Sequence, residues 1–355
     1  GVVMVTLFTA ATIMGLAYAI DPEAVVIEPI SVPEDLMLKG YTSTVISDRV
    51  TEEMHRIHEV SQTKEESRGV SLGSEETTVS ALEEELDVSG PVWIVREQLD
   101  IKQFKIQGEI VNVENGLEFR LRGFPKVGSM MVAVEKGTLS EIDSLIERAA
   151  EEALRFADPY VLAVYYYGKE EGTGDFTETV GAIQAGLNPE KIGEHGARDL
   201  KHLLTLWARV ELSEKNYVGT IHKVQQALEV DPAHGMAYHM WGGALFALGK
   251  YREAIEKCKL AAKYNPNMPA VYDVWGDALE ALGYPEKAQE AYGIATQLDP
   301  DFAHVHFSRG DLYFRLKNYE EAMRHYNLGL AVDPHNVKHE YNIEQTRKAL
   351  GIDSP

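Results

Sequence analysis

Residues 231–266 read DPAHGMAYHMWGGALFALGKYREAIEKCKLAAKYNP, and residues 265–300 read NPNMPAVYDVWGDALEALGYPEKAQEAYGIATQLDP. The second segment repeats the pattern of the first at an offset of 34 residues. The same punctuation closes each repeat, as Asp231-Pro232, Asn265-Pro266, Asp299-Pro300 and Asp333-Pro334. A period of 34 residues with a closing proline is typical of stacked helical hairpins, because proline cannot continue a helix.

Equivalent positions of these repeats carry residues that suit close helix packing. Tryptophan recurs in one position and glycine in the next, where the missing side chain lets two helices approach. The aligned sets are Trp207, Trp241 and Trp275 (Arg309 departs), Gly242, Gly276 and Gly310, Ala254, Ala288 and Ala322, and Val224, Cys258, Tyr292 and Tyr326. On these residues, the chain resembles the tetratricopeptide repeat (TPR) family over four units, residues 199–334. The resemblance implies an all-α right-handed solenoid whose first helices line a surface that binds peptides or proteins.

Alignment with the family places a set of polar and aromatic residues on that inner surface. The partner-binding positions it implies are His202, Arg209, His239, Phe246, Asp273, Asp277, Glu280, His304, Asp311, Phe314 and Arg315. Asp273, Asp277 and Glu280 are spaced by four and three residues, so three acids share one helix face. An acidic centre flanked by aromatic and cationic residues suits a mixed or basic peptide. The alternative is a solvated helix face that only keeps the surface soluble.

The composition excludes some classes of partner. The 355-residue chain has 56 acidic and 34 basic residues, for a net charge of −22. This charge opposes binding to nucleic acid, which needs clustered lysine and arginine. The single cysteine, Cys258, allows no intrachain disulfide, and its place in the repeat indicates a buried packing residue.

The first 20 residues, Gly1–Ile20, are apolar and carry no charge. A stretch of ~20 apolar residues can span a bilayer. Ala17-Tyr18-Ala19 also fits the cleavage site of a secretory signal. The first basic residue after it is Lys39, which indicates that the following side is not cytoplasmic. We expect a single-pass protein of a bacterial inner membrane with its domains in the periplasm, or a protein secreted to the periplasm after cleavage.

Residues 21–157 predict a small α+β domain. Strands are expected at 25–27, 92–95, 104–113, 117–122 and 130–134, with a polar connection at 61–90. Helices are expected after Thr42 or Ser43, and after the capping pair of Thr138 and Glu141. Asn115-Gly116 indicates a hairpin, and a three-residue loop that places Val111 and Val113 against Phe119 and Leu117 is favoured over a two-residue loop.

The remaining segments predict the ends of the solenoid. Residues 158–198 resemble a degenerate first repeat with a spacer, and residues 335–355 predict a capping helix and a tail. No catalytic, nucleotide-binding or zinc motif is present in the sequence, and His335 and His339 alone do not make a metal site. We therefore expect a non-catalytic adaptor with no cofactor and no metal. The alternatives are an enzyme or enzyme subunit with its site in the α+β domain and the repeats recruiting substrate, and a self-assembling structural protein.

Overall fold

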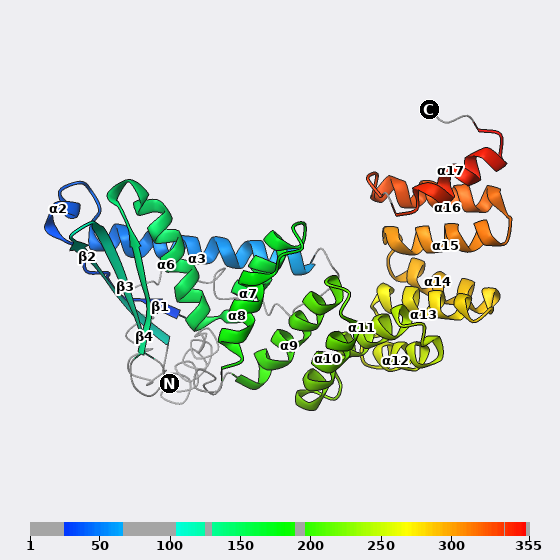
Figure 1. The fold of residues 1–355 in the computed structure, drawn as a ribbon, viewed down its shortest axis with the longest axis horizontal. Helices are drawn as coiled ribbons and strands as arrows, with labels where there is room; N and C mark the ends of the chain where they lie inside the picture. The colour runs from blue at the N-terminus through cyan, green and yellow to red at the C-terminus, as the bar shows by residue number, and fades with distance from the viewer. Residues whose placement is uncertain (1–24, 67–103, 125–129, 189–195, 337, 353–355) are drawn as a thin grey trace, which may run out of the picture. The chain divides into compact units, whose positions relative to one another are not determined.

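The computed structural model describes residues 25–66, 104–124, 130–188, 196–336 and 338–352. The chain divides into two compact parts, residues 1–196 and 197–355, and each is described by itself (Figure 1). Among the described residues, no helix is long and apolar enough to cross a membrane. The predicted anchor or signal at Gly1–Ile20 and the strand expected at 92–95 lie outside the described residues.

A four-stranded sheet lies in the N-terminal part, with the strand order β1-β2-β3-β4. The strands are β1 (Val25–Ile27), β2 (Phe104–Val113), β3 (Gly116–Phe124) and β4 (Met130–Gly137). β1 pairs in parallel with β2, and β2, β3 and β4 pair in antiparallel order. These four strands confirm the strands predicted in the same places.

The β2–β3 hairpin differs from both registers considered for it. Ile110 lies opposite Phe119, and the loop consists of Glu114 and Asn115. Gly116 opens β3 with a φ of +145°, and a Cβ there would come within 2.4 Å of the Gly137 carbonyl oxygen. The preferred three-residue loop was therefore wrong. The buried face consists of Ile106, Ile110, Leu117, Phe119 and Leu121, because strand alternation turns Val111 and Val113 to the other face.

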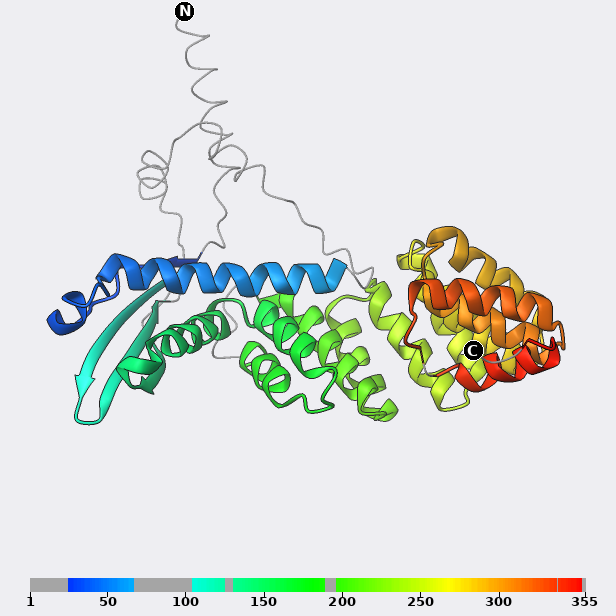
Figure 2. The same ribbon diagram turned by 90° about the horizontal axis from the view of Figure 1, so that it is seen from above.

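Helices cover this sheet and extend the N-terminal part. They are α2 (Glu34–Met37), α3 (Ser43–Glu66), the 3-10 turn η1 (Leu139–Glu141), α6 (Ile142–Ala157), α7 (Pro159–Glu170) and α8 (Thr177–Gly186). The predicted stripe Ile46, Val50, Met54 and Ile57 is buried. It lies on α3, the long blue helix of Figure 2. α3 runs on to Glu66, so the polar connection expected from residue 61 begins later than predicted.

α6 packs on β3 and β4 through the apolar residues predicted for it. Ile142, Leu145, Ile146, Ala149 and Ala153 are all buried. The Glu141 carboxylate accepts a 2.9 Å hydrogen bond from the Thr138 backbone N–H, so the expected capping pair starts this segment. α7 and α8 form a hairpin in the range where a degenerate repeat was expected, and α7 packs on α3 and α6 of the N-terminal part.

Four helical pairs and a closing helix form the C-terminal part. The pairs are α9 (Gly196–Ser213) with α10 (Tyr217–Val230), α11 (Gly235–Ala247) with α12 (Tyr251–Tyr264), α13 (Pro269–Ala281) with α14 (Pro285–Leu298), and α15 (Ala303–Arg315) with α16 (Tyr319–Val332). α17 (Glu340–Ala349) follows them and begins five residues later than the helix expected from His335. The first helices α11, α13 and α15 each pack on the second helix of their pair, and they also contact one another in sequence.

The recurring tryptophans are only partly buried. The Lys223 ammonium lies 3.2 Å from the centre of the Trp207 ring, and the Lys257 ammonium lies 3.6 Å from that of Trp241. Cys258 is fully buried, and burial raises the pKa of its thiol to about 12. This confirms Cys258 as a packing residue, because a protonated and buried thiol is unreactive.

Candidate partner-binding groove

Two glycines of the first helices let two tyrosines reach toward the inner surface. A Cβ at Gly276 would come within 2.4 Å of the Tyr292 ring, and one at Gly310 within 2.5 Å of the Tyr326 ring. Both tyrosines are fully buried on the second helices α14 and α16. The glycine therefore makes room for the tyrosine in each of these two repeats.

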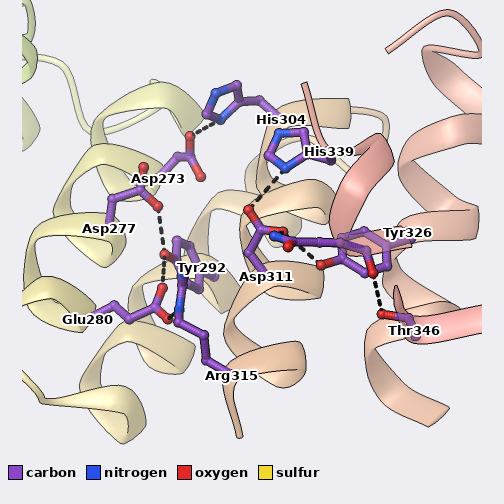
Figure 3. A network of polar contacts seen from close by, with 11 residues as sticks. Asp273, Asp277, Glu280, Tyr292, His304, Asp311, Arg315, Tyr326, His339 and Thr346 are labelled. Carbon is purple, nitrogen blue, oxygen red and sulfur yellow. Dashed lines mark hydrogen bonds and ion pairs between the residues drawn. The ribbon is translucent and has the colours of Figure 1, made fainter. Parts of the chain in front are cut away.

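Each of these tyrosines holds an aspartate of the paired first helix. The Tyr292 hydroxyl donates to Asp277 Oδ1 at 2.7 Å, and the Tyr326 hydroxyl donates to Asp311 Oδ1 at 2.7 Å (Figure 3). The two pairs are related by the repeat period. A buried tyrosine hydroxyl needs a hydrogen-bond partner. In these two repeats the partner is an aspartate of the first helix, so the hydrogen bond holds the position of that carboxylate.

Asp277 is hard to ionise in this position. Burial and the neighbouring Asp273 raise the pKa of the Asp277 carboxyl to about 7, although the hydrogen bond from Tyr292 and the nearby His304 act against this shift. The carboxyl can therefore exchange a proton near neutral pH.

Asp273 lies deeper than its neighbours on α13. Its side chain is 2% exposed, and its Oδ2 atom forms a hydrogen bond with Nδ1 of His304 on α15. The hydrogen bond to Asp273 raises the pKa of His304 against the effect of burial, which favours an imidazolium paired with a carboxylate. Oδ1 of Asp273 is buried without a hydrogen-bond partner among the described residues.

Glu280 joins Asp277 at the other end of the same helix face. Its Oε2 accepts from the Tyr292 hydroxyl at 3.3 Å, and its Oε1 accepts from Nε of Arg315 at 2.5 Å. Arg315 comes from α15, so the ion pair links two successive first helices. The Glu280 side chain is 11% exposed, whereas that of Arg315 is 57% exposed.

Asp311 ties the closing helix to the last repeat. It accepts hydrogen bonds from Tyr326, from Nδ1 of His339 at 3.0 Å, and from the Asn342 amide at 2.9 Å. Burial opposes ionisation of Asp311, but these hydrogen bonds outweigh it and hold its pKa below the ordinary value. The His339 ring also stacks on Phe307, with ring centroids 4.8 Å apart.

These groups meet around a pocket of about 570 Å³. Phe246 of α11, Leu312 and Leu316 give it an apolar wall. The charged and titratable side chains that line it are Asp277, Glu280, Asp311, His304, Arg315, Lys338 and His339. The pocket therefore combines an apolar wall with carboxylates that are already held in place.

Residues 274–336, from α13 to just beyond α16, match the family model of the tetratricopeptide repeat. The α13–α14 and α15–α16 pairs are tetratricopeptide repeats. The resemblance expected from the spacing of tryptophan, glycine and proline is thus confirmed for this part of the chain. No curated protein sequence matches the chain.

Solved TPR structures are similar to the chain at low identity. A TPR protein of Thermus thermophilus is 20% identical, with a TM-score of 0.42, over 55% of this chain and 98% of its own. Pseudomonas aeruginosa pilF is 18% identical, with a TM-score of 0.45, over 57% of this chain and 86% of pilF. The first TPR of Spaghetti, solved with an HSP90 peptide, is 24% identical, with a TM-score of 0.31. The match covers 33% of this chain and 93% of the Spaghetti chain.

The TPR helices bring together only some of the expected site residues. Phe246, Asp277, Glu280, His304, Asp311 and Arg315 line the pocket. Asp273 is buried against His304 and does not line the pocket, and Phe314 packs toward the core of the last repeat. His239 lies on α11, where burial lowers its pKa to about 4.

Two expected residues lie on α9, in the first repeat. The His202 ring meets the His234 ring edge to face, with centroids 5.5 Å apart. Arg209 lies on the same helix, near enough to His239 to disfavour its protonation. Neither residue lines the pocket that the later repeats form.

Several residues of the groove were not predicted as part of it. Tyr292 and Tyr326 were assigned to the core alone, and His339, Asn342 and Lys338 were left in the closing segment. A signal for the tyrosines was present, because Asp277 and Asp311 each precede a tyrosine by 15 residues. Among the described residues, no group of three or more histidine, cysteine or acidic side chains could hold a metal ion.

Proposed function

We propose that this protein is a non-catalytic adaptor whose TPR groove holds a partner protein through a cationic side chain of that partner. The observation that carries the proposal is the pocket in which Phe246, Leu312 and Leu316 stand beside fixed carboxylates. A lysine or arginine side chain has the matching shape, with an aliphatic stem and a charged end.

The carboxylates of the pocket differ in how many hydrogen bonds they already accept from the protein. Asp311 receives three hydrogen bonds, and Glu280 is paired with Arg315. Tyr292 reaches only Oδ1 of Asp277, so Oδ2 can accept a hydrogen bond from a ligand. Asp277 is therefore the group that would receive the cationic end of a partner side chain.

The charge balance at Asp277 favours such a ligand. The negative charge of Asp273 and Glu280 raises the pKa of Asp277, in addition to burial. A cation bound at Asp277 would offset this repulsion and stabilise the ionised carboxylate. Binding would then release a proton near neutral pH, so an increase of affinity with pH between about 6 and 8 supports the assignment.

The test uses an array of random 12-residue peptides and the full chain. The variant Asp277→Asn with Glu280→Gln keeps the side-chain shapes and removes two charges. We expect wild-type protein to select peptides rich in lysine or arginine, and the variant to lose at least ~10-fold in affinity for them. Acetylation of the selected lysines should cause the same loss.

A matched control carries the same charge change on an exposed surface. Glu286→Gln with Glu290→Gln alters two exposed acids of α14, and neither residue lines the pocket. This control should bind like wild type. Selection of peptides without lysine or arginine, or equal losses in both variants, would contradict the proposed binding chemistry.

We further propose that Gly1–Ile20 anchors the chain in a bacterial inner membrane, with both described parts in the periplasm. An uncharged apolar segment of this length supports the proposal, as does the acidic sequence that follows it. Protease added to intact spheroplasts should degrade the TPR part. In a separate fractionation without protease, the protein should remain in the membrane fraction. Protection from the protease would contradict the orientation, and release by mild salt would contradict the anchor.

A further inference from the structure

The carboxylates of the pocket are already partly occupied by donors of the protein itself. Three carboxylates line the pocket, those of Asp277, Glu280 and Asp311. Each of them accepts a hydrogen bond from another side chain on at least one of its two oxygens (Figure 3). Among the described residues that line the pocket, no carboxylate therefore presents both of its oxygens to a ligand.

This arrangement distinguishes the two basic side chains that a partner could offer. The planar guanidinium of arginine binds a carboxylate best when two parallel N–H groups reach both oxygens at once. The ammonium of lysine is a compact charge whose three hydrogens point in different directions, so it needs only one oxygen of any carboxylate. A carboxylate with a single free oxygen therefore loses more of its interaction with arginine than of its interaction with lysine.

The acceptors that stay free in the pocket lie on separate side chains. Tyr292 uses Oδ1 of Asp277 and leaves Oδ2 without a donor among the described residues. His339 also lines the pocket and is 6% exposed, and its Nε2 has no hydrogen-bond partner in the part of the chain that the structure describes. Because Nδ1 of the neutral ring donates to Asp311, Nε2 is an acceptor. Single acceptors on separate side chains suit an ammonium better than a planar fork.

The guanidinium of Arg315 already uses one of the pocket carboxylates. Its Nε donates to Oε1 of Glu280 at 2.5 Å. The Tyr292 hydroxyl has one hydrogen, and its contact with Asp277 at 2.7 Å is shorter than its contact with Glu280 at 3.3 Å. Arg315 is therefore the main donor to Glu280, and it prevents this carboxylate from offering both oxygens to a ligand.

We propose that the pocket selects lysine over arginine as the basic residue of the partner, an inference that rests on the proposed function. Asp277 receives the ammonium through its free oxygen, while Phe246 and Leu312 of the apolar wall contact the lysine stem. Arg315 determines this specificity because it holds Glu280. Without the Arg315 guanidinium, both oxygens of Glu280 become available, and arginine gains more affinity than lysine.

Three libraries of 12-residue peptides with blocked ends test the selectivity of the full chain in mild detergent. Each library carries lysine, arginine or glutamine at one fixed central position and random uncharged residues elsewhere. We expect the tightest lysine peptides to bind at least ~10-fold more tightly than the same peptides with arginine. The same peptides with glutamine should bind most weakly, because they carry no charge for Asp277.

Two variants test the role of Arg315. Arg315→Gln should reduce the ratio of lysine to arginine affinity at least ~3-fold, while the lysine peptides still bind. Arg324→Gln is the matched control, because Arg324 is also 57% exposed and paired with a carboxylate, but it lies outside the pocket. This control should keep the wild-type ratio.

The possible results separate this inference from the proposed function. Arginine peptides that bind wild type as tightly as lysine peptides, or a ratio that Arg315→Gln leaves unchanged, would overturn the selectivity and leave the cation pocket intact. Equal binding of all three libraries would instead contradict the cation pocket and the selectivity together.

Discussion

The hydroxyl of Tyr292 donates a 2.7 Å hydrogen bond to Asp277, which connects a fully buried side chain of α14 to the pocket surface of α13. Tyr326 and Asp311 repeat this relationship one TPR unit later. Packing inside each helical pair therefore sets where two carboxylates of the groove stand. The same hydrogen bonds therefore contribute to the packing of two helical pairs and to the geometry of the pocket.

Tyr292→Phe should lower the free energy of unfolding by ~1 to 2 kcal/mol, because it leaves the Asp277 carboxyl without its donor. The pKa of Asp277 should rise further above about 7, since the hydrogen bond from Tyr292 now holds it down. Urea unfolding and a carboxyl carbon NMR titration measure the two effects. Tyr284→Phe, at a residue that is 48% exposed, is the control and should change neither.

Gly276→Ala should destabilise the TPR part by ~1 to 3 kcal/mol, because the new methyl group would overlap the Tyr292 ring. Gly293 provides the opposite case within the next helix, since a Cβ there meets no atom within 4 Å. Gly293→Ala should stabilise by up to ~1 kcal/mol through helix propensity. If the two variants changed the melting temperature by the same amount in the same direction, the close approach of Tyr292 would not explain why residue 276 is a glycine.

The contribution of Asp277 to the unfolding free energy should fall as the pH rises from about 4 to about 7. The folded pKa of Asp277, about 7, exceeds its ordinary value of 3.8, so its contribution is complete below about pH 4 and is lost as the pH rises through 7. The raised pKa of His304 adds a further fall above its ordinary value of 6.5. The difference in unfolding free energy between wild type and Asp277→Asn, measured by urea unfolding, should therefore fall over this pH range, whereas Asp301→Asn on the surface should give no pH-dependent difference.

Asp311→Ala should loosen the closing helix α17. The substitution removes the acceptor of His339 and Asn342, two residues that connect α17 and the segment before it to α15. We expect a loss of ~2 to 3 kcal/mol and faster hydrogen exchange across residues 340–349. An exchange rate that stays as slow as in the exposed-site control Asp301→Ala would mean that Ile343 and the other apolar contacts hold this helix alone.

The sequence predicted the helical repeats better than it predicted the hairpin or the groove. Repeated prolines and glycines mark helix ends directly, and the helix starts at Gly235, Pro269 and Ala303 keep the same interval. The β2–β3 register was missed because apolar residues occur on both strand faces. Which of Val113 and Ile110 is buried depends on the tertiary packing of the sheet, which the local pattern does not contain.

The sequence predicted which helix face the groove residues occupy, but it did not predict how deeply each side chain is buried. Asp273 and Asp277 share one face of α13, yet one is buried with His304 and the other reaches the pocket. Depth depends on how α13 and α15 approach each other, which is a tertiary property. The role of Tyr292 was missed for a related reason, because its hydroxyl crosses from one helix of the pair to the other.

The most direct test of the adaptor function places a photo-crosslinking amino acid at Lys338, an exposed residue at the pocket. The full chain is irradiated in cells, and crosslinked proteins are identified by mass spectrometry, with and without Asp277→Asn and Glu280→Gln. We expect a discrete partner that crosslinks through a lysine-rich or arginine-rich segment and disappears in the double variant. A partner captured equally by both forms would contradict this proposal.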